Sequence, residues 1–180
     1  MTGKTHASCG LLVGAWTTQY YQTDIFTTVT VMCLATMASL LPDICHMRSK
    51  IGRRLKLISF IIRLLFGHRT FTHSLIFVFL IASALVLIHS PLYYLVSIIG
   101  GLLSHVILDM LTPRGVQLFY PLPQNIHFPI TVKTGGWMDL SLATALTVGA
   151  AYTLFQPAFE DFFFYIGKYF AWAREIGRAS

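Results

Sequence analysis

Long apolar runs separated by short polar segments make up most of this chain. Formal charge is absent from four stretches, residues 5–23, 25–42, 70–108 and 140–159. Pro91 divides the third of these stretches. A helix needs about 20 apolar residues to cross the hydrocarbon core of a bilayer. We therefore expect about five membrane-spanning helices, near residues 6–22, 25–42, 73–89, 92–111 and 137–156.

Three further segments are too short or too polar to span. Residues 55–65 carry Lys56 and Arg63 within an apolar run, which is typical of a helix lying at the membrane interface. The stretch from Ala158 onward is dense in aromatic residues and predicts a second interfacial helix. The loop 112–136 is rich in proline and glycine, so we expect an irregular cap there.

Composition agrees with a membrane environment. Of the 180 residues 55% are hydrophobic and only 11% are charged, whereas soluble domains carry about 25% charged residues. The apolar runs recur to the end of the chain, which leaves no stretch for a separate soluble domain. The prediction is a single domain, residues 1–180, folded as an all-α polytopic membrane helical bundle.

Basic residues predict the orientation of the spans. The loop after the second span contains Arg48, Lys50, Arg53, Arg54, Lys56, Arg63 and Arg69. Lys4, Arg114 and Lys133 are expected on the same side, and the opposite side has no lysine or arginine between the spans. The positive-inside rule then places the N-terminus and the loops 43–72 and 112–136 in the cytoplasm.

Histidines and carboxylates recur at the ends of the apolar runs. His6, Asp43, His73, Asp109 and Asp139 each lie at such an end, and His105 precedes Asp109 by one helical turn. If the runs cross a bilayer in alternation, all of these ends face the same side. We therefore expect a shared site there.

His105 and Asp109 form the strongest local pattern. A spacing of four residues places both side chains on one helix face, where they could hold a transition metal together. The alternative is a pair that only stabilises the helix. However, a charged carboxylate in a span costs roughly 2.5–3.5 kcal/mol, which favours a functional role.

The segment 68–74 adds a second group of candidates. Thr70 and Thr72 are good N-cap residues, so a helix starting there would direct His73 at the site. His68 and Arg69 would lie in the loop above it. Arg69 could hold a phosphate through its guanidinium fork, although it could equally be a basic anchor, and His68 a solvated loop residue.

Four more residues complete the predicted site. Asp43 directly follows a span, and we interpret it as a metal ligand that also takes part in catalysis. His46 is a candidate ligand or outer-shell group, and His6 is a candidate ligand. Asp139 is an acid–base candidate, with a helix-dipole role as the alternative.

Imidazoles and carboxylates together favour a divalent transition metal. Zinc is the first choice, and manganese and iron are alternatives. Magnesium and calcium are less suitable, because they prefer sites made of oxygen ligands alone. Six candidate ligands exceed the four of one tetrahedral zinc, which favours two ions. Such a site could activate water and neutralise a phosphoryl oxygen.

The chain resembles a known family at these residues. His6, LLPDICH at 40–46, GHRTFTHS at 67–74 and GLLSHVILDMLTPRGVQLFYP at 101–121 are similar to the YdjM-type family of bacterial inner-membrane proteins, regarded as metal-dependent hydrolases. The family is distantly similar to zinc-dependent phospholipase C and P1-type nucleases, which implies a phosphoester substrate. Some members are linked to LexA control, which implies a connection to the DNA-damage response. Where the family commonly has PDIDH, this chain has Cys45 in place of the second acid.

The sequence thus predicts hydrolysis of a phosphoester by metal-activated water at the cytoplasmic face of a bacterial inner membrane. Membrane lipids are the expected partners, a lipid or lipid-linked phosphate is the expected substrate, and no nucleic acid is expected. A metal-binding or transport protein is one alternative, and a non-catalytic membrane scaffold is another.

Overall fold

The chain folds almost entirely into helices. The structure, a computed structural model, describes residues 1–45, 53–54, 56–66 and 69–179. Its α-helices are α1 (Gly3–Tyr21), α2 (Ile25–Ala38), α4 (Lys56–Phe66), α5 (Leu75–Leu87), α6 (Leu92–Met110) and α7 (Trp137–Ala179). Two short 3-10 helices are η1 (Leu41–Cys45) and η2 (Phe71–His73). Within the described ranges, extended backbone pairs only in an isolated bridge between Val116 and Ile126. The predicted all-α class is confirmed.

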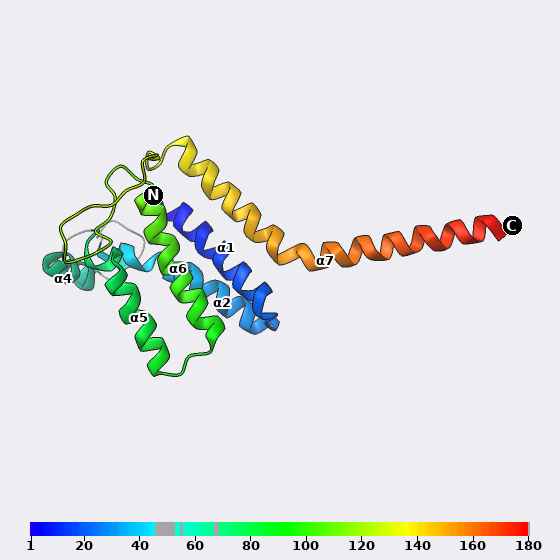
Figure 1. Cartoon of the computed structure of the whole chain (residues 1–180), viewed down its shortest axis with the longest axis horizontal. Helices are drawn as coiled ribbons and strands as arrows, with labels where there is room; N and C mark the ends of the chain where they lie inside the picture. The colour runs from blue at the N-terminus through cyan, green and yellow to red at the C-terminus, as the bar shows by residue number, and fades with distance from the viewer. Residues whose placement is uncertain (46–52, 55, 67–68, 180) are drawn as a thin grey trace.

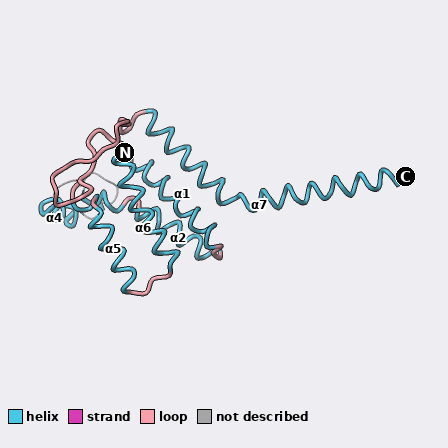
Figure 2. The backbone as a smooth tube through the Cα atoms, viewed as in Figure 1, coloured by secondary structure: helices cyan, strands magenta, loops and turns pink. Residues whose placement is uncertain are grey.

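Helix α1 lies at the centre of the bundle. It packs against α2, α6 and the first half of α7, and α6 also packs against α2 and α5 (Figure 1). Figure 2 shows the long loop between α6 and α7 at the same end of the bundle as the start of α1. The start of α1, the end of α6 and the start of α7 therefore lie at the same end of the bundle.

Small residues let the central helices approach closely. A Cβ atom added at Gly14 of α1 would lie 2.8 Å from the Cα of Met32 in α2. One added at Gly101 of α6 would overlap the carbonyl oxygen of Ala35 and lie 3.0 Å from the Cβ of Ala38. Membrane helices use small residues in this way, because close backbone packing replaces the hydrophobic driving force.

The number of spans differs from the prediction. Among the residues that the structure describes, two helices are long and apolar enough to cross a membrane, α6 and the Trp137–Phe170 part of α7. Helices α2 and α5, with 14 and 13 residues, are apolar but only about 21 and 20 Å long, against a core of about 30 Å. Helix α1 is not one of the two candidate spans, because its second half is polar. Over the described ranges the structure thus has two candidate spans, fewer than the five predicted.

The shortened helices have a local cause. The run 25–42 ends early because Leu41–Cys45 turns into η1, and the run from 73 begins late because Phe71–His73 forms η2. The N-cap of α5 is Ser74, whose hydroxyl accepts from the N–H of Phe77 at 3.3 Å. Thr70 is the N-cap residue of η2, without a side-chain hydrogen bond, and the α-helix itself starts after Ser74 instead of after Thr72.

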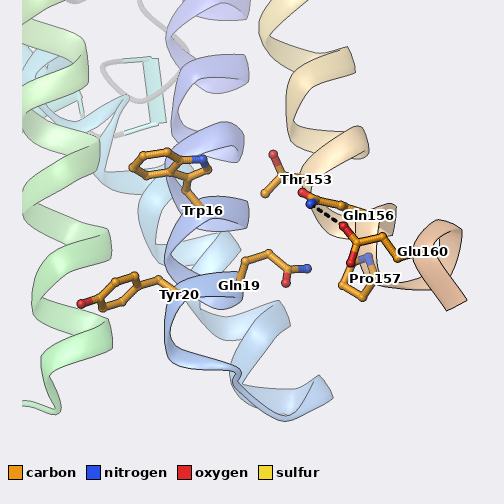
Figure 3. Close-up of a pocket in the computed structure, with 7 residues that line it drawn as sticks. All are labelled: Trp16, Gln19, Tyr20, Thr153, Gln156, Pro157 and Glu160. Atoms are coloured by element: carbon orange, nitrogen blue, oxygen red, sulfur yellow. Dashed lines mark hydrogen bonds between the residues drawn. The ribbon is translucent and has the colours of Figure 1, made fainter.

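The aromatic C-terminal stretch continues α7 instead of forming a separate helix. Pro157 lies inside α7, and the helix changes direction in this region and extends away from the bundle (Figure 1). Proline removes a backbone hydrogen bond and commonly bends a helix. A cavity of about 400 Å³ lies beside the bend, lined by Trp16, Gln19, Tyr20, Thr153, Gln156, Pro157 and Glu160 (Figure 3).

Candidate metal centre

Five predicted ligands come from four elements and meet at one end of the bundle. His6 is in the first turns of α1, Asp43 in η1, His73 at the end of η2, and His105 and Asp109 in the last turns of α6. The three histidines and Asp109 are buried, whereas Asp43 keeps a side-chain exposure of 20%. Residues far apart in the sequence thus lie together at one end of the bundle.

Four of these side chains could hold one metal ion. Asp43, His73, His105 and Asp109 each offer one ligand atom, and these atoms all lie within 4.8 Å of one another. The Nε2 atoms of His73 and His105 are 3.1 Å apart, and Oδ2 of Asp109 lies 3.5 and 3.8 Å from them. A tetrahedron with zinc–nitrogen bonds of about 2.0–2.1 Å has edges of about 3.4 Å. The donor set and its size fit a bound divalent metal.

The ring of His105 is oriented by the backbone. Its Nδ1 lies 2.7 Å from the carbonyl oxygen of Ser39, at the end of α2. A carbonyl oxygen only accepts, so Nδ1 carries the proton and Nε2 presents a lone pair to the cluster. A metal-ligating histidine typically makes this second hydrogen bond.

His73 has a similar outer contact. Its Nδ1 lies 3.0 Å from the hydroxyl of Thr72, which leaves Nε2 facing Asp109. Burial opposes a positive charge on this ring, but hydrogen bonding to Asp109 and the proximity of Cys45 outweigh it and raise the pKa of His73 to about 9. In the metal-free protein the side chain of His73 is therefore a positively charged imidazolium at neutral pH.

Asp109 is the centre of the charge network. The amino group of Met1 lies 2.5 Å from its Oδ1, and the Nη2 atom of Arg69 lies 3.0 Å from its Oδ2. The Nε2 of His6 is 3.3 Å from Oδ1. A buried carboxylate is costly unless it is paired with cationic groups, and the amino group of Met1 and the guanidinium of Arg69 supply them.

His6 is packed against the cluster by its ring. It stacks on His105 with centroids 3.9 Å apart and an interplanar angle of 16°. In the part of the chain that the structure describes, neither ring nitrogen of His6 makes a hydrogen bond, although both are buried. Buried polar atoms usually have a partner, so this ring is suited to an additional ligand role.

Arg69 lies at the rim of the site. Besides its contact with Asp109, its Nη1 donates to the hydroxyl of Thr112 at 2.9 Å, and the side chain is 17% exposed. Its backbone φ is +63°, a left-handed conformation that non-glycine residues rarely adopt. The backbone N–H of Gln117 donates to the carbonyl oxygen of Arg69, which ties this turn to the long loop.

Asp139 lies outside the four-residue cluster. Its carboxylate accepts from the backbone N–H groups of Gly135 at 2.8 Å and Thr2 at 3.0 Å, and from the hydroxyl of Thr5. These bonds tie the start of α7 to the start of α1. The acid–base role stays a prediction, and the hydrogen bonds favour a structural one.

The remaining predicted residues are placed differently. His46 and His68 lie outside the described residues. Cys45 is buried, its thiol lies 3.4 Å from the carbonyl oxygen of Pro42, and it also lies close to the ring of His73. The cluster of potential ligands does not include it.

Sequence reasoning missed the outer contacts of the site. The hydroxyls of Thr72 and Thr112 carried a usable signal, because each lies next to or within one turn of a predicted site residue. The contact with the backbone carbonyl of Ser39 could not be predicted from the sequence, because every residue type has a backbone carbonyl.

Together these features define an apolar helical protein with a buried imidazole–carboxylate cluster at one end of its bundle. Residues 1–174 match the YdjM inner membrane protein family, and the chain belongs to that family. The resemblance seen in the sequence is confirmed.

Similar proteins occur in Bacillus subtilis, Escherichia coli and Shigella flexneri. The uncharacterized protein YvsG of Bacillus subtilis is 34% identical over 159 residues, which cover 87% of this chain and 96% of that protein. The inner membrane protein YdjM of Escherichia coli is 41% identical over 120 residues, covering 63% of this chain and 61% of that protein. YdjM of Shigella flexneri matches to the same extent. No solved structure matches the chain.

Proposed function

We propose that this protein is a membrane-bound, metal-dependent hydrolase that cleaves a phosphoester in a lipid or lipid-linked substrate. The observation that carries the proposal is the cluster of Asp43, His73, His105 and Asp109, whose ligand atoms lie within 4.8 Å of one another. The oriented ring of His105 adds to it, because its Nδ1 is held by Ser39 and its Nε2 faces His73 and Asp109.

The residues of the cluster would bind the metal ion. His73, His105, Asp109 and Asp43 would hold the metal, with His6 as a further ligand. Zinc suits this donor set best, and manganese or iron would also fit. A bound metal supplies Lewis acidity and lowers the pKa of a coordinated water.

Two residues at the accessible side would act on the substrate. Arg69 can donate to a phosphoryl oxygen in fork geometry, because its guanidinium is partly exposed beside the cluster. Asp43 is the most exposed carboxylate of the set and is suited to accept a proton from the attacking water.

The position of the cluster favours a substrate at the membrane surface. All five candidate ligands lie at helix ends or in the 3-10 helices that flank them. Transporter sites usually lie near the bilayer midplane on broken helices, so this placement favours an enzyme over a metal transporter. The proposal includes a bacterial inner-membrane location with the cluster and the N-terminus on the cytoplasmic side.

Elemental analysis of detergent-purified protein tests the proposal, followed by a hydrolysis screen of phospholipids and soluble phosphoesters. We expect about one or two divalent ions per chain and metal-dependent release of phosphate or alcohol. Protein that binds no zinc, manganese or iron on titration would overturn it. Hydrolysis that survives both His105→Ala and chelation would do the same.

A further inference from the structure

Helix α4 carries large apolar residues on its exposed surface. Ser59 is fully buried, whereas Leu57 and Leu64 are both 72% exposed and Phe60 is 52% exposed. These apolar residues recur at intervals of three and four and so share one face. A soluble protein would turn that face inward, so the exposed face of α4 is adapted to an apolar surrounding.

Charge around α4 has a single sign. Arg53, Arg54 and Lys56 are exposed at its start. The sequence contains no aspartate or glutamate between Asp43 and Asp109, while it contains seven lysine and arginine residues there. This segment therefore attracts an anionic surface and repels a cationic one.

The position of α4 joins it to the candidate metal centre. It packs against η1, the element that carries Asp43. Figure 1 shows α4 beside that end of the bundle and close to end-on, whereas α5 and α6 run across the view. A helix that crosses the bundle direction at its end suits the plane of a membrane surface.

We propose that α4 is a membrane-surface helix that docks into an anionic lipid leaflet. Leu57, Phe60 and Leu64 insert between the acyl chains, and the basic residues at its start contact lipid phosphates. A second copy of the chain is a poorer occupant, because it carries the same net charge of +6 and the same basic segment. The docking holds Asp43 and the cluster at headgroup depth.

This inference does not depend on hydrolysis or on a bound metal. The experiment reconstitutes the full chain carrying Phe60→Trp into nanodiscs of phosphatidylcholine, with or without phosphatidylglycerol. Lipids brominated near the headgroup end of the acyl chain quench the new tryptophan if it inserts. The wild-type signal from Trp16, Trp137 and Trp172 is subtracted.

We expect clear quenching, stronger with phosphatidylglycerol than without it. In the Phe60→Trp background, Arg53→Gln with Arg54→Gln should abolish the difference between the two lipids. Lys133→Gln with Lys168→Gln removes the same charge elsewhere and should preserve that difference.

Absence of quenching at position 60 would overturn the proposal, and so would quenching with no dependence on anionic lipid. Leu64→Trp provides a second reporter on the same face if Phe60→Trp misfolds. If the tryptophan becomes protected from bromine quenching only when the protein-to-nanodisc ratio rises, a second copy of the chain covers this face of α4 instead of lipid.

Discussion

The Nε2 atoms of His73 and His105 face each other at 3.1 Å in a buried pocket. Two nitrogen lone pairs repel at this distance, so without a metal ion one of the two Nε2 atoms must carry a proton. The Nδ1 of His105 already donates to Ser39, so the Nε2 of His105 accepts and the proton lies on the Nε2 of His73. A metal ion that binds both rings would have to displace this proton.

Metal affinity should fall as the pH is lowered. The pKa of His73 is raised to about 9, so this ring keeps its proton at neutral pH until a metal displaces it. In the metal-free protein, the stabilisation from this proton is full below the usual pKa of 6.5 and is lost as the pH rises through about 9.

Competition titrations with a chelating dye between pH 6 and 8 measure this effect. We expect tighter binding at the higher pH, together with proton release detected by calorimetry in two buffers of different ionisation enthalpy. Equal affinity at both ends of the range, without proton release, would contradict the prediction.

Replacing a ligand of the cluster should remove the metal. His105→Ala and Asp109→Ala each delete one donor of the four, and the loss should exceed the roughly 10–100-fold that outer-shell changes cost. Elemental analysis of the purified variants measures it. His127→Ala is the matched control, because His127 is exposed in the long loop. Full metal content in both cluster variants would contradict the assignment.

The hydroxyl of Thr72 should tune the metal affinity without being a ligand. It lies 3.0 Å from Nδ1 of His73 and fixes the orientation of that ring. Thr72→Val should weaken metal binding by roughly 10–100-fold, whereas Thr72→Ser should restore most of it. Thr144→Val, at an exposed threonine of α7, provides the comparison. Equal affinities for Thr72→Val and the wild type would exclude this orienting role.

The sequence predicted which side chains come together better than it predicted the lengths of the helices. His105 and Asp109 share a helix face by spacing alone, and the ends of the apolar runs indicated which other residues meet them. Polar groups in an apolar chain are costly, so their positions carry strong information.

Helix ends were less predictable, because hydropathy does not distinguish an α-helix from a 3-10 turn. Asp43 and His73 both lie in 3-10 helices that interrupt apolar runs. Each interruption shortens a predicted span and directs its side chain into the pocket. The residues that bring the helices together, Gly14 and Gly101, act through close contact, which a hydropathy pattern does not contain.

Close packing at Gly101 should control both stability and the metal centre. An added Cβ would overlap the carbonyl oxygen of Ala35, and Gly101 precedes His105 by one turn of α6. Gly101→Ala should therefore cost roughly 1–3 kcal/mol of stability and also lower metal affinity. Thermal unfolding in detergent measures the first effect and metal titration the second. Gly167→Ala is the control, because nothing lies within 4 Å of its added Cβ. An unfolding temperature of Gly101→Ala equal to that of the wild type would contradict the prediction, because the added Cβ would then cause no loss of stability.

Asp139 allows a structural role to be separated from an acid–base role. Its carboxylate accepts from Gly135, Thr2 and Thr5, so Asp139→Ala leaves these donors unpaired and should cost roughly 1–3 kcal/mol.

Asp139→Asn retains one acceptor oxygen and should lose less stability, with metal content close to that of the wild type. Parallel thermal unfolding and elemental analysis of both variants test this. If Asp139→Asn instead unfolds at the same temperature as the wild type but no longer catalyses hydrolysis, Asp139 has the acid–base role.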